Sequence, residues 1–245
     1  MSQNNPRTVL LSYANAAFGR ALNALTAEAG AFPFAAVYAL READLAATEF
    51  WPAHGDFVRA HPRGGGYWLW KPFLVQRLLA TLADGDVLVY ADAGCALDAA
   101  KLPRFAEYVA ATAAHPSGVL AFEMPHPQRV WTKAAAAAAV AARGPVDLDA
   151  GQVAATSFML RASPETRRLV ADWYALCADY RLLDDSPSRT ADGVALPEDP
   201  AFREHRHDQA LWSLLVRQGA PLLIPDEMWP PGAVETGPIV AARRR

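Results

Sequence analysis

Apolar residues occur along this chain in two alternating patterns. Short apolar runs, typical of buried strands, occupy residues 8–13, 34–40, 87–91, 118–122, 153–161 and 221–225. Between them, apolar residues recur at helical spacing over 15–29, 72–83, 102–114, 131–143, 163–180 and 204–218, with shorter helical turns at 43–50 and 56–60. The alternation of strand and helix through the first half predicts an α/β fold with an open, mostly parallel central sheet and helices on both faces.

Residues 183–200 are the one long segment without a periodic pattern. This segment is rich in Asp, Ser and Pro, and loops of that length in compact domains are usually lids or other functional excursions. From Trp229 onward, frequent prolines predict coil. The closing Arg243–Arg245 is expected to be a solvated tail, because three charges are a short run and nothing basic accompanies them.

Composition narrows the classes of function. The chain has 245 residues, of which 52% are hydrophobic and 20% charged, so it fits one large domain or two closely fused halves. Its net charge of -3 provides no basic footprint for nucleic acid. No apolar stretch is long enough for a membrane span, and Met1–Arg7 lacks the layout of a signal peptide, so we expect a cytoplasmic protein. Cys95 and Cys177 lie far apart in apolar patterns and are expected to be reduced thiols.

An aspartate follows one of the predicted strands directly. The run Val87–Ala91 leads into Asp92-Ala93-Gly94. In open α/β sheets ligands bind at the carboxyl ends of the strands, so Asp92 is placed at the functional edge. An aspartate after a strand also commonly closes the turn with its own side chain. We favour a ligand-binding role for Asp92, because it stands at the far end of an apolar run that already has a polar residue, Asp86, at its start.

A glycine-rich aromatic segment precedes that strand, with the sequence Arg63-Gly64-Gly65-Gly66-Tyr67-Trp68-Leu69-Trp70-Lys71-Pro72. A proline is accepted in the first turn of a helix, so Lys71 lies at a helix start, where an ammonium ion beside free N–H groups can neutralise phosphate. The alternative is a surface lysine with a buried stem. Lys71, Lys101 and Lys133 are the only lysines among 23 Lys and Arg residues, and two of them lie close to tryptophans, which favours a specific role for Lys71 and Lys133.

The two tryptophans of this segment have two interpretations. Trp68 and Trp70 alternate with Leu69, a spacing that fits core anchors as well as rings that stack on a sugar or base. The three preceding glycines leave the backbone open to the close approach of a ligand. Their spacing differs from that of a Walker loop or a dinucleotide-binding fingerprint, and no clear strand precedes them.

A second polar block, Arg206-His207-Asp208-Gln209, begins the last predicted helix. Asp208 and Gln209 are either ordinary first-turn residues that complement the helix dipole or ligand-binding groups at the helix start. His207 is either a hydrogen-bonding neighbour or a metal ligand. The residue types alone leave these alternatives open.

Together, the aromatic-Lys-Pro helix start, the run DVLVYADAG and the run RHDQALWSLL resemble bacterial and viral glycosyltransferases of the GT-A fold. At greater distance the chain is similar to the glycogenin-like retaining transferases. The resemblance covers about Val9 to Leu223 and implies one GT-A-like domain over 1–245, with a nucleotide-binding half at about 7–125 and an acceptor- and sugar-binding half at about 126–228. Where those enzymes hold a divalent metal with an Asp-any-Asp triplet, this chain has Asp92-Ala93-Gly94, so the second carboxylate is missing.

The resemblance also implies roles for individual residues. Asp208 and Gln209 match an Asp-Gln pair that contacts the transferred sugar, which makes them the predicted catalytic residues. The predicted donor-binding residues are Tyr13, Asn15, Lys71, Tyr90, Asp92 and Gly94, with the first two at the nucleoside base. Sugar and acceptor contacts are expected from Arg63, Trp68, Trp70, Lys133, Thr156 and Ser157. A divalent metal, Mn²⁺ or Mg²⁺, would be held by Asp92 with His207 as a second ligand, since magnesium keeps several waters beside one carboxylate.

These features predict an enzyme that transfers a sugar from a nucleoside diphosphate donor to a hydroxyl acceptor, such as a surface glycan. Retention of configuration is implied only by the distant similarity to the glycogenin-like transferases. A sugar nucleotidyltransferase shares such a sheet but usually carries a glycine-rich, basic N-terminal loop, whereas Ser12–Arg20 contains one glycine and one arginine. A non-catalytic module that binds nucleotide sugars is a third alternative, because the missing carboxylate also fits lost activity. The donor base, the sugar, the acceptor and the oligomeric state stay open at this stage.

Overall fold

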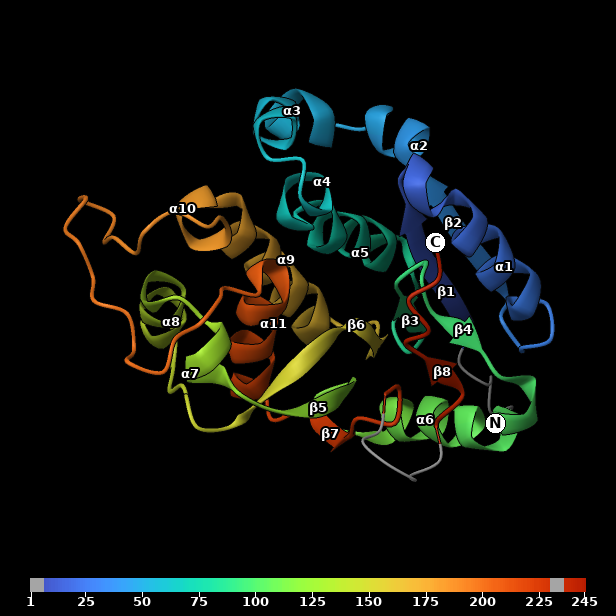
Figure 1. Cartoon of the computed structure of the whole chain (residues 1–245). Coiled ribbons are helices and arrows are strands. Elements are labelled where there is room, and N and C mark those ends of the chain that lie inside the picture. The colour runs from blue at the N-terminus through green and yellow to red at the C-terminus, as the bar shows by residue number, and fades with distance from the viewer. Residues whose placement is uncertain (1–6, 230–235) are drawn as a thin grey trace.

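A computed structural model describes residues 7–229 and 236–245, and its centre is a six-stranded sheet (Figure 1). The strands, in the order β2-β1-β3-β6-β5-β7, are β1 (Thr8–Ala14), β2 (Ala36–Arg41), β3 (Val87–Ala91), β5 (Val119–Pro127), β6 (Gly151–Arg161) and β7 (Leu222–Pro225). β1 pairs in parallel with β2 and β3, and β5 pairs in parallel with β7. β6 runs antiparallel to both of its neighbours, β3 and β5. The predicted open, mostly parallel sheet is therefore confirmed.

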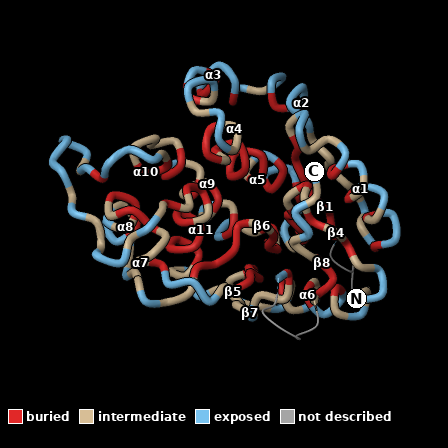
Figure 2. Tube along the Cα trace, viewed as in Figure 1, coloured by how far each residue is buried: buried red, intermediate tan, exposed pale blue. Residues whose placement is uncertain are grey.

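Helices cover both faces of this sheet, as predicted (Figure 1). One face carries α5 (Trp70–Thr81), α8 (Ala134–Ala141), α9 (Pro164–Ala178) and α11 (His207–Gln218), and the other carries α1 (Gly19–Ala29) and α6 (Leu102–Ala114). Leu88 and Tyr90 of β3 pack in the first of these two cores, whereas Val87 and Val89 pack in the second, because successive side chains of a strand point to opposite faces. Buried residues accordingly follow the sheet and the helix sides that face it (Figure 2).

Shorter elements connect these helices and strands. They are the 3-10 turns η1 (Ala16–Phe18) and η2 (Ala99–Lys101), the helices α2 (Glu42–Ala46), α3 (Phe50–Ala60), α4 (Gly64–Tyr67), α7 (Gln128–Trp131) and α10 (Tyr180–Leu183), and the strands β4 (Ala96–Leu97) and β8 (Ile239–Val240). Of the predicted helix 131–143, residues 134–141 form α8, and only Trp131 belongs to α7. Thr132 and Lys133, between these two helices, have extended backbones. The Lys133 N–H donates to His205 Nδ1 at 3.3 Å, so a tertiary contact takes a donor that a continuous helix would use.

Residues 236–245 form a strap that corrects two expectations. β8 pairs with β4 in antiparallel fashion, with Ala96 opposite Val240. The backbone N–H of Arg244 donates to the carbonyl oxygen of Gly94 at 3.1 Å. The end of the chain is therefore not coil throughout, and Arg243–Arg245 is not a free tail. The sequence pattern missed this pairing because the two strands have only two residues each and lie far apart along the chain.

The three consecutive glycines and the two aromatic residues after them form a left-handed turn. Gly64, Gly65, Gly66, Tyr67 and Trp68 have φ angles of 59°, 62°, 82°, 54° and 62°. A left-handed backbone costs about 1–2 kcal/mol for each residue that carries a Cβ atom, so glycine at the first three positions limits this cost. A Cβ on Gly64 would also lie 2.5 Å from the Trp68 ring. The glycines thus serve this turn, whereas the sequence predicted an open backbone for a ligand.

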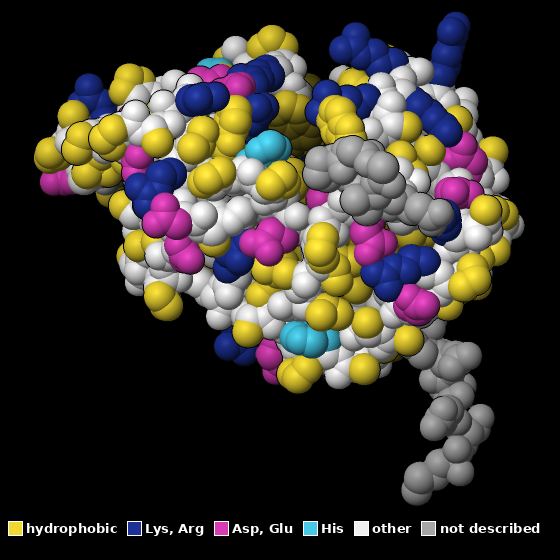
Figure 3. All heavy atoms as spheres, turned by 60° about the horizontal axis from the view of Figure 1, so that its bottom comes forward, with side chains coloured by type: hydrophobic (Ala, Val, Ile, Leu, Met, Phe, Trp, Pro, Cys, Tyr) yellow, Lys and Arg dark blue, Asp and Glu magenta, His cyan; other side chains and the backbone are white. Residues whose placement is uncertain are grey.

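None of the helices within 7–229 and 236–245 is long and apolar enough to cross a membrane. On the face shown in Figure 3, Lys and Arg side chains alternate with Asp and Glu side chains. The segment used for the expected localisation, Met1–Arg7, lies outside the described residues except for Arg7. The division into a nucleotide-binding half and an acceptor-binding half stays a prediction.

Candidate functional site

Both sequence motifs meet at the carboxyl end of β3. Lys71 of α5 is buried, and its Nζ lies 3.2 Å from Asp92 Oδ1 and 3.2 Å from Asp208 Oδ2. The same ammonium group donates to the carbonyl oxygen of Ala155 in β6 at 3.0 Å. The Tyr90 hydroxyl donates to Asp92 Oδ1 at 2.6 Å. We call Lys71, Tyr90, Asp92 and Asp208 the Lys71 cluster, which joins side chains from three separate segments of the chain.

The Lys71 cluster holds two carboxylates around one ammonium group. Burial raises the pKa of Asp208 to about 6, with Lys71 opposing the rise and Asp92 adding to it. Burial by itself would lower the pKa of Lys71, but the nearby carboxylates of Asp208 and Asp92 outweigh it, so this pKa is raised and the ammonium stays charged. Burial, reinforced by Asp92, holds the pKa of Tyr90 well above its ordinary value. At neutral pH the cluster therefore carries one excess negative charge.

Two amide side chains connect α11 to the middle of the sheet. Gln209 Nε2 donates to Gln152 Oε1 at 2.9 Å, and the backbone N–H of Ala155 donates to Gln209 Oε1 at 3.4 Å. Gln209 thus lies next to the Lys71 cluster, since Ala155 contacts both. Gln152 was not among the predicted site residues, and its signal in the sequence is an amide in a strand that also carries Thr156 and Ser157.

Thr156 and Ser157, the two predicted sugar contacts of β6, lie in different environments. Ser157 is fully buried, and its Oγ donates to the Tyr90 carbonyl oxygen at 2.7 Å, so this hydroxyl links β6 to β3. The carbonyl oxygen of Thr156, a half-buried residue, accepts a hydrogen bond from the Asp92 N–H at 2.9 Å. Thr156 therefore remains a candidate for a ligand contact, while the Ser157 hydroxyl is already used within the fold.

An aromatic pair and two unpaired oxygens lie where β1 ends. The rings of Tyr13 and Trp70 are 4.3 Å apart, and Trp70 Nε1 donates to the Gly64 carbonyl oxygen at 2.9 Å. Ser12 Oγ and Asn15 Oδ1 are buried and have no hydrogen-bond partner among the described residues. Buried polar atoms without partners are rare, and each deserves an explanation such as a ligand or a water molecule. Ser12 is a second residue that sequence analysis did not select.

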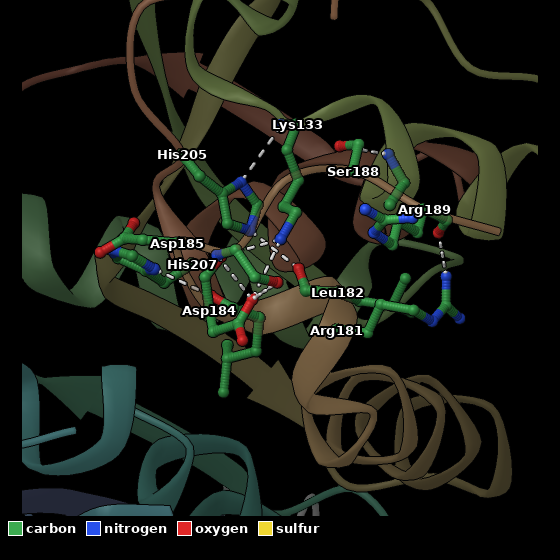
Figure 4. Close-up of polar contacts among 12 residues, drawn as sticks. Lys133, Arg181, Leu182, Asp184, Asp185, Ser188, Arg189, His205 and His207 are labelled. Carbon is green, nitrogen blue, oxygen red and sulfur yellow. Dashed lines mark hydrogen bonds and ion pairs between the residues drawn. The ribbon is translucent and has the colours of Figure 1, made fainter. Parts of the chain in front are cut away.

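His207 belongs to a different set of contacts. Its Nδ1 donates to the Leu183 carbonyl oxygen at 2.9 Å, and its Nε2 lies 3.7 Å from Asp185 Oδ1 (Figure 4). Its ring stacks on Tyr67 with the centroids 4.4 Å apart. The predicted substrate residues Arg63 and Trp68 also join this set: Arg63 pairs with Asp185 at 3.4 Å, and Trp68 stacks on His207 at 5.8 Å.

Lys133 is buried in a third set of contacts (Figure 4). Its Nζ donates to the Asp184 carbonyl oxygen at 3.0 Å and lies 3.1 Å from Asp184 Oδ1. His205 Nε2 donates to the Leu182 carbonyl oxygen at 2.9 Å within the same set. A cavity of about 310 Å³ lies beside it and is lined by Glu198 and Phe202, among others. The ammonium group of Lys133 ties the irregular segment to α8, and its predicted role in substrate binding stays a prediction.

The strap covers the turn that follows β3. A Cβ atom on Gly94 would lie 3.2 Å from the Arg244 carbonyl oxygen and 3.6 Å from the Arg243 Cα atom. The Arg244 guanidinium pairs with Glu28 of α1 at 2.5 Å, and the Arg243 guanidinium lies 3.7 Å from the centre of the Trp229 ring. Gly94 was predicted to contact the donor, but its missing side chain gives room to the strap.

The residues present do not fit a metal centre at Asp92 and His207. Asp92 Oδ1 already accepts from Tyr90 and pairs with Lys71, while His207 contacts Leu183 and Asp185. Residues 7–229 and 236–245 contain no group of three or more His, Cys, Asp or Glu side chains arranged to hold a metal ion. The Lys71 ammonium occupies the place between two carboxylates that a cation would need. We therefore derive no step through a metal ion.

Comparison with known proteins finds a similarity to solved structures. No protein-family model matches the chain, and no curated protein matches it. The crystal structure of mouse xyloside xylosyltransferase 1, in its apo form, matches over 91% of this chain and 86% of that chain, with a TM-score of 0.45 and 9% sequence identity. A match at this TM-score supports no conclusion on activity or substrate, so the function proposed below rests on the residues of the site.

Proposed function

We propose that this chain is a glycosyltransferase that moves a sugar from a nucleoside diphosphate donor to a hydroxyl acceptor, such as a surface glycan, with retention of configuration. The observation that carries the proposal is the convergence of the two motif blocks in the Lys71 cluster. Lys71, Asp92 and Asp208 come from separate parts of the chain and form one buried ion-paired group at the carboxyl end of β3. Ligands of open α/β sheets bind at this edge.

The surroundings of the cluster also support a nucleotide-sugar donor. The stacked rings of Tyr13 and Trp70, together with the unpaired oxygens of Ser12 and Asn15, offer an apolar surface and hydrogen-bond acceptors or donors beside the charged groups. A nucleoside needs both kinds of contact, because its base is flat and its edges and ribose are polar. We assign Tyr13 and Asn15 to the nucleoside on this basis.

Each charged residue then has a defined task. Positive charge develops on the sugar as its bond to the diphosphate breaks, and a fixed carboxylate near it stabilises the transition state. Asp208 fits this task because Lys71 holds its Oδ2 in place at 3.2 Å and Gln209 follows it at the start of α11. Lys71 is a positioning residue in this proposal, since its ammonium is already shared between Asp92 and Asp208. Asp92 faces the donor from the end of β3.

Donor turnover tests this proposal. Purified protein is incubated with a panel of nucleoside diphosphate sugars, with Mn²⁺ and with EDTA, and the released nucleoside diphosphate is measured. We expect slow hydrolysis of at least one donor, and a decrease of about 100-fold or more in Asp208→Asn, the size typical of a lost electrostatic contact to the transition state. Asp172→Asn is the matched control, because Asp172 is exposed and pairs with Arg143 on the outer side of α9.

The outcomes separate the alternatives. Donor binding by the wild type without hydrolysis or transfer to any acceptor would indicate a non-catalytic nucleotide-sugar-binding module. Release of inorganic diphosphate from a nucleoside triphosphate and a sugar phosphate would indicate a nucleotidyltransferase. Absence of any donor binding would contradict the proposal as a whole. The anomeric configuration of a transferred product, read by NMR, tests retention.

A further inference from the structure

The Lys71 cluster has no positive charge to spare for a diphosphate. Its single ammonium lies between two carboxylates, Asp92 and Asp208, at 3.2 Å from each. A diphosphate would bring further negative charge to a group that already carries an excess of it. Burying like charges without compensation is costly, so a donor of this kind needs positive charge from elsewhere.

The strap brings three arginines to the same edge of the sheet. Arg243 and Arg244 lie against Gly94, which is only two residues after Asp92, or at most about 8 Å along the chain. Backbone pairing with Gly94, the pairing of β8 with β4 and the hydrogen bond from the Ala241 N–H to the Met228 carbonyl oxygen hold the strap in this place.

The three arginines are not equivalent. Arg244 is committed to the fold, since it pairs with Glu28, and Glu28 also accepts from the backbone N–H of Leu97. Arg243 is exposed and lies over the Trp229 ring without a carboxylate partner among the described residues. Arg245 is exposed and makes no hydrogen bond or ion pair with any residue that the structure describes. Two guanidinium groups are therefore uncommitted beside a site that lacks positive charge.

We propose that Arg243 and Arg245 bind the diphosphate of the donor, with Arg244 and Glu28 anchoring the strap that presents them. This inference rests on the proposed function, because it names residues for the same donor. Guanidinium groups form paired N–H donors that match phosphate oxygens, and they stay charged at every relevant pH. The strap arginines thus supply the positive charge that a metal ion would otherwise provide. A Cβ atom on Gly94 would lie 3.2 Å from the Arg244 carbonyl oxygen, so a side chain there presses on the strap.

Calorimetry without metal tests the inference. UDP, GDP, dTDP, CDP and ADP are screened against the wild type in EDTA, and the tightest ligand is titrated beside its nucleoside. We expect the double variant Arg243→Gln, Arg245→Gln to bind the diphosphate about tenfold more weakly or worse, the loss of at least one charge-assisted hydrogen bond, with unchanged affinity for the nucleoside. The dependence of the affinity on salt should also become shallower.

Two controls keep the test specific. Arg143→Gln removes an exposed arginine that pairs with Asp172 beyond α8, away from the strap, and should leave the diphosphate affinity unchanged. Thermal unfolding of each variant verifies that it is folded. Gly94→Val, which displaces the strap without removing a charge, should also weaken diphosphate binding more than nucleoside binding.

The outcomes distinguish this inference from the proposed function. Wild-type binding that the double variant retains in full would overturn the role of the strap and leave the proposed function standing. Binding that disappears in EDTA and returns with Mn²⁺ in wild type and double variant alike would overturn it in favour of a metal ion. Failure of the wild type to bind any of the five nucleoside diphosphates, with metal or without it, would overturn both.

Discussion

Lys71 and Lys133 are both buried beside aspartates, but their surroundings differ in charge. Lys133 pairs with one carboxylate, Asp184, whose side chain keeps 17% of its exposure. Burial raises the pKa of Asp184, yet hydrogen bonds from Ser186 and the nearby Lys133 outweigh it and leave that pKa lowered. Lys71 faces two carboxylates, and the pKa of Asp208 is raised to about 6.

This difference separates a satisfied ion pair from a candidate site. In the folded chain the Asp184 carboxyl group ionises more readily than it does in water, so its ion pair with Lys133 is favourable and holds the irregular segment in place. The Asp208 carboxyl group, beside Lys71, ionises less readily than it does in water. This unfavourable state persists only because the surrounding fold imposes it. Perturbed groups of this kind cluster at functional sites. Burial of a lysine alone therefore does not mark a site, whereas the balance of charges around it does.

Removal of the ammonium from the Lys71 cluster should have the largest effect on stability. Lys71→Met leaves Asp92 and the buried Asp208 facing each other without a cation, so we expect a loss of about 3–5 kcal/mol in the free energy of unfolding at pH 8. The loss should shrink at pH 5, where Asp208 binds a proton. Urea unfolding at both pH values measures this, and an equal loss at the two values would contradict it.

Turnover and stability should respond to pH in opposite directions around the pKa of Asp208. Below about pH 6 this carboxyl takes up a proton and loses its assigned charge, so turnover should fall as pH falls through 6. The native pKa lies above the ordinary value of 3.8, so between these values the native state binds the proton more tightly than the unfolded chain does. The contribution of Asp208 to stability therefore decreases as pH rises through that window.

Three of the groups around Asp208 do not titrate in the same range. Burial raises the pKa values of Tyr90 and Cys177, and Lys71 stays charged. Rate and unfolding profiles from pH 4.5 to 8, for the wild type and Asp208→Asn, check this assignment. A midpoint near pH 6 that survives in Asp208→Asn would assign the titration to another group.

Lys133→Met should have a smaller effect, confined to stability. The variant loses hydrogen bonds to Asp184, but that carboxylate keeps a bond from Ser186 and partial contact with water. We expect a loss of about 1–3 kcal/mol in the free energy of unfolding and unchanged donor affinity. A selective loss of donor or acceptor affinity, measured by calorimetry on folded protein, would restore the substrate role that the sequence predicted for Lys133.

Ser157→Ala should give the smallest effect of the series. It removes one buried hydrogen bond, from Ser157 Oγ to the Tyr90 carbonyl oxygen, which is worth about 1 kcal/mol. Thermal unfolding and donor turnover check this together. A decrease in turnover far beyond the change in stability would show that the hydroxyl also contacts the substrate.

The sequence predicted the sheet from local patterns and the candidate site residues from their motifs. The apolar run ending at Asp92 predicts a strand and its carboxyl edge, and Asp208 and Gln209 were selected by their motif at a helix start. The ion pairs of Lys71 follow from how α5 and α11 pack, which periodicity does not report. Gln152 and Ser12 were missed because a single polar residue within a buried strand has the same appearance whether it binds a ligand or not.

Three further residues of the motif blocks, His207, Arg63 and Trp68, form a set of contacts with Asp185, and their predicted roles stay predictions. Trp68 and His207 have left-handed backbones, with φ angles of 62° and 50°, which periodicity does not report. A run of glycines indicates a flexible backbone, but it does not indicate whether that backbone is left-handed. The strap was missed because its pairing with β4 and Gly94 is a long-range contact made by a short, polar segment.

The position of β6 in the sheet also affects how the protein is made. β3 and β5 have no pairing with each other and are joined only through β6, so the inner edge of β3 stays open until residues 151–161 have been synthesised. Ribosomes add about 5–20 residues per second, so this edge is exposed for roughly 4 to 14 seconds on each nascent chain. Open edges are templates for pairing with other chains. Soluble yield in a cell should therefore depend on the speed of translation through this interval and on chaperones that shield the nascent β3.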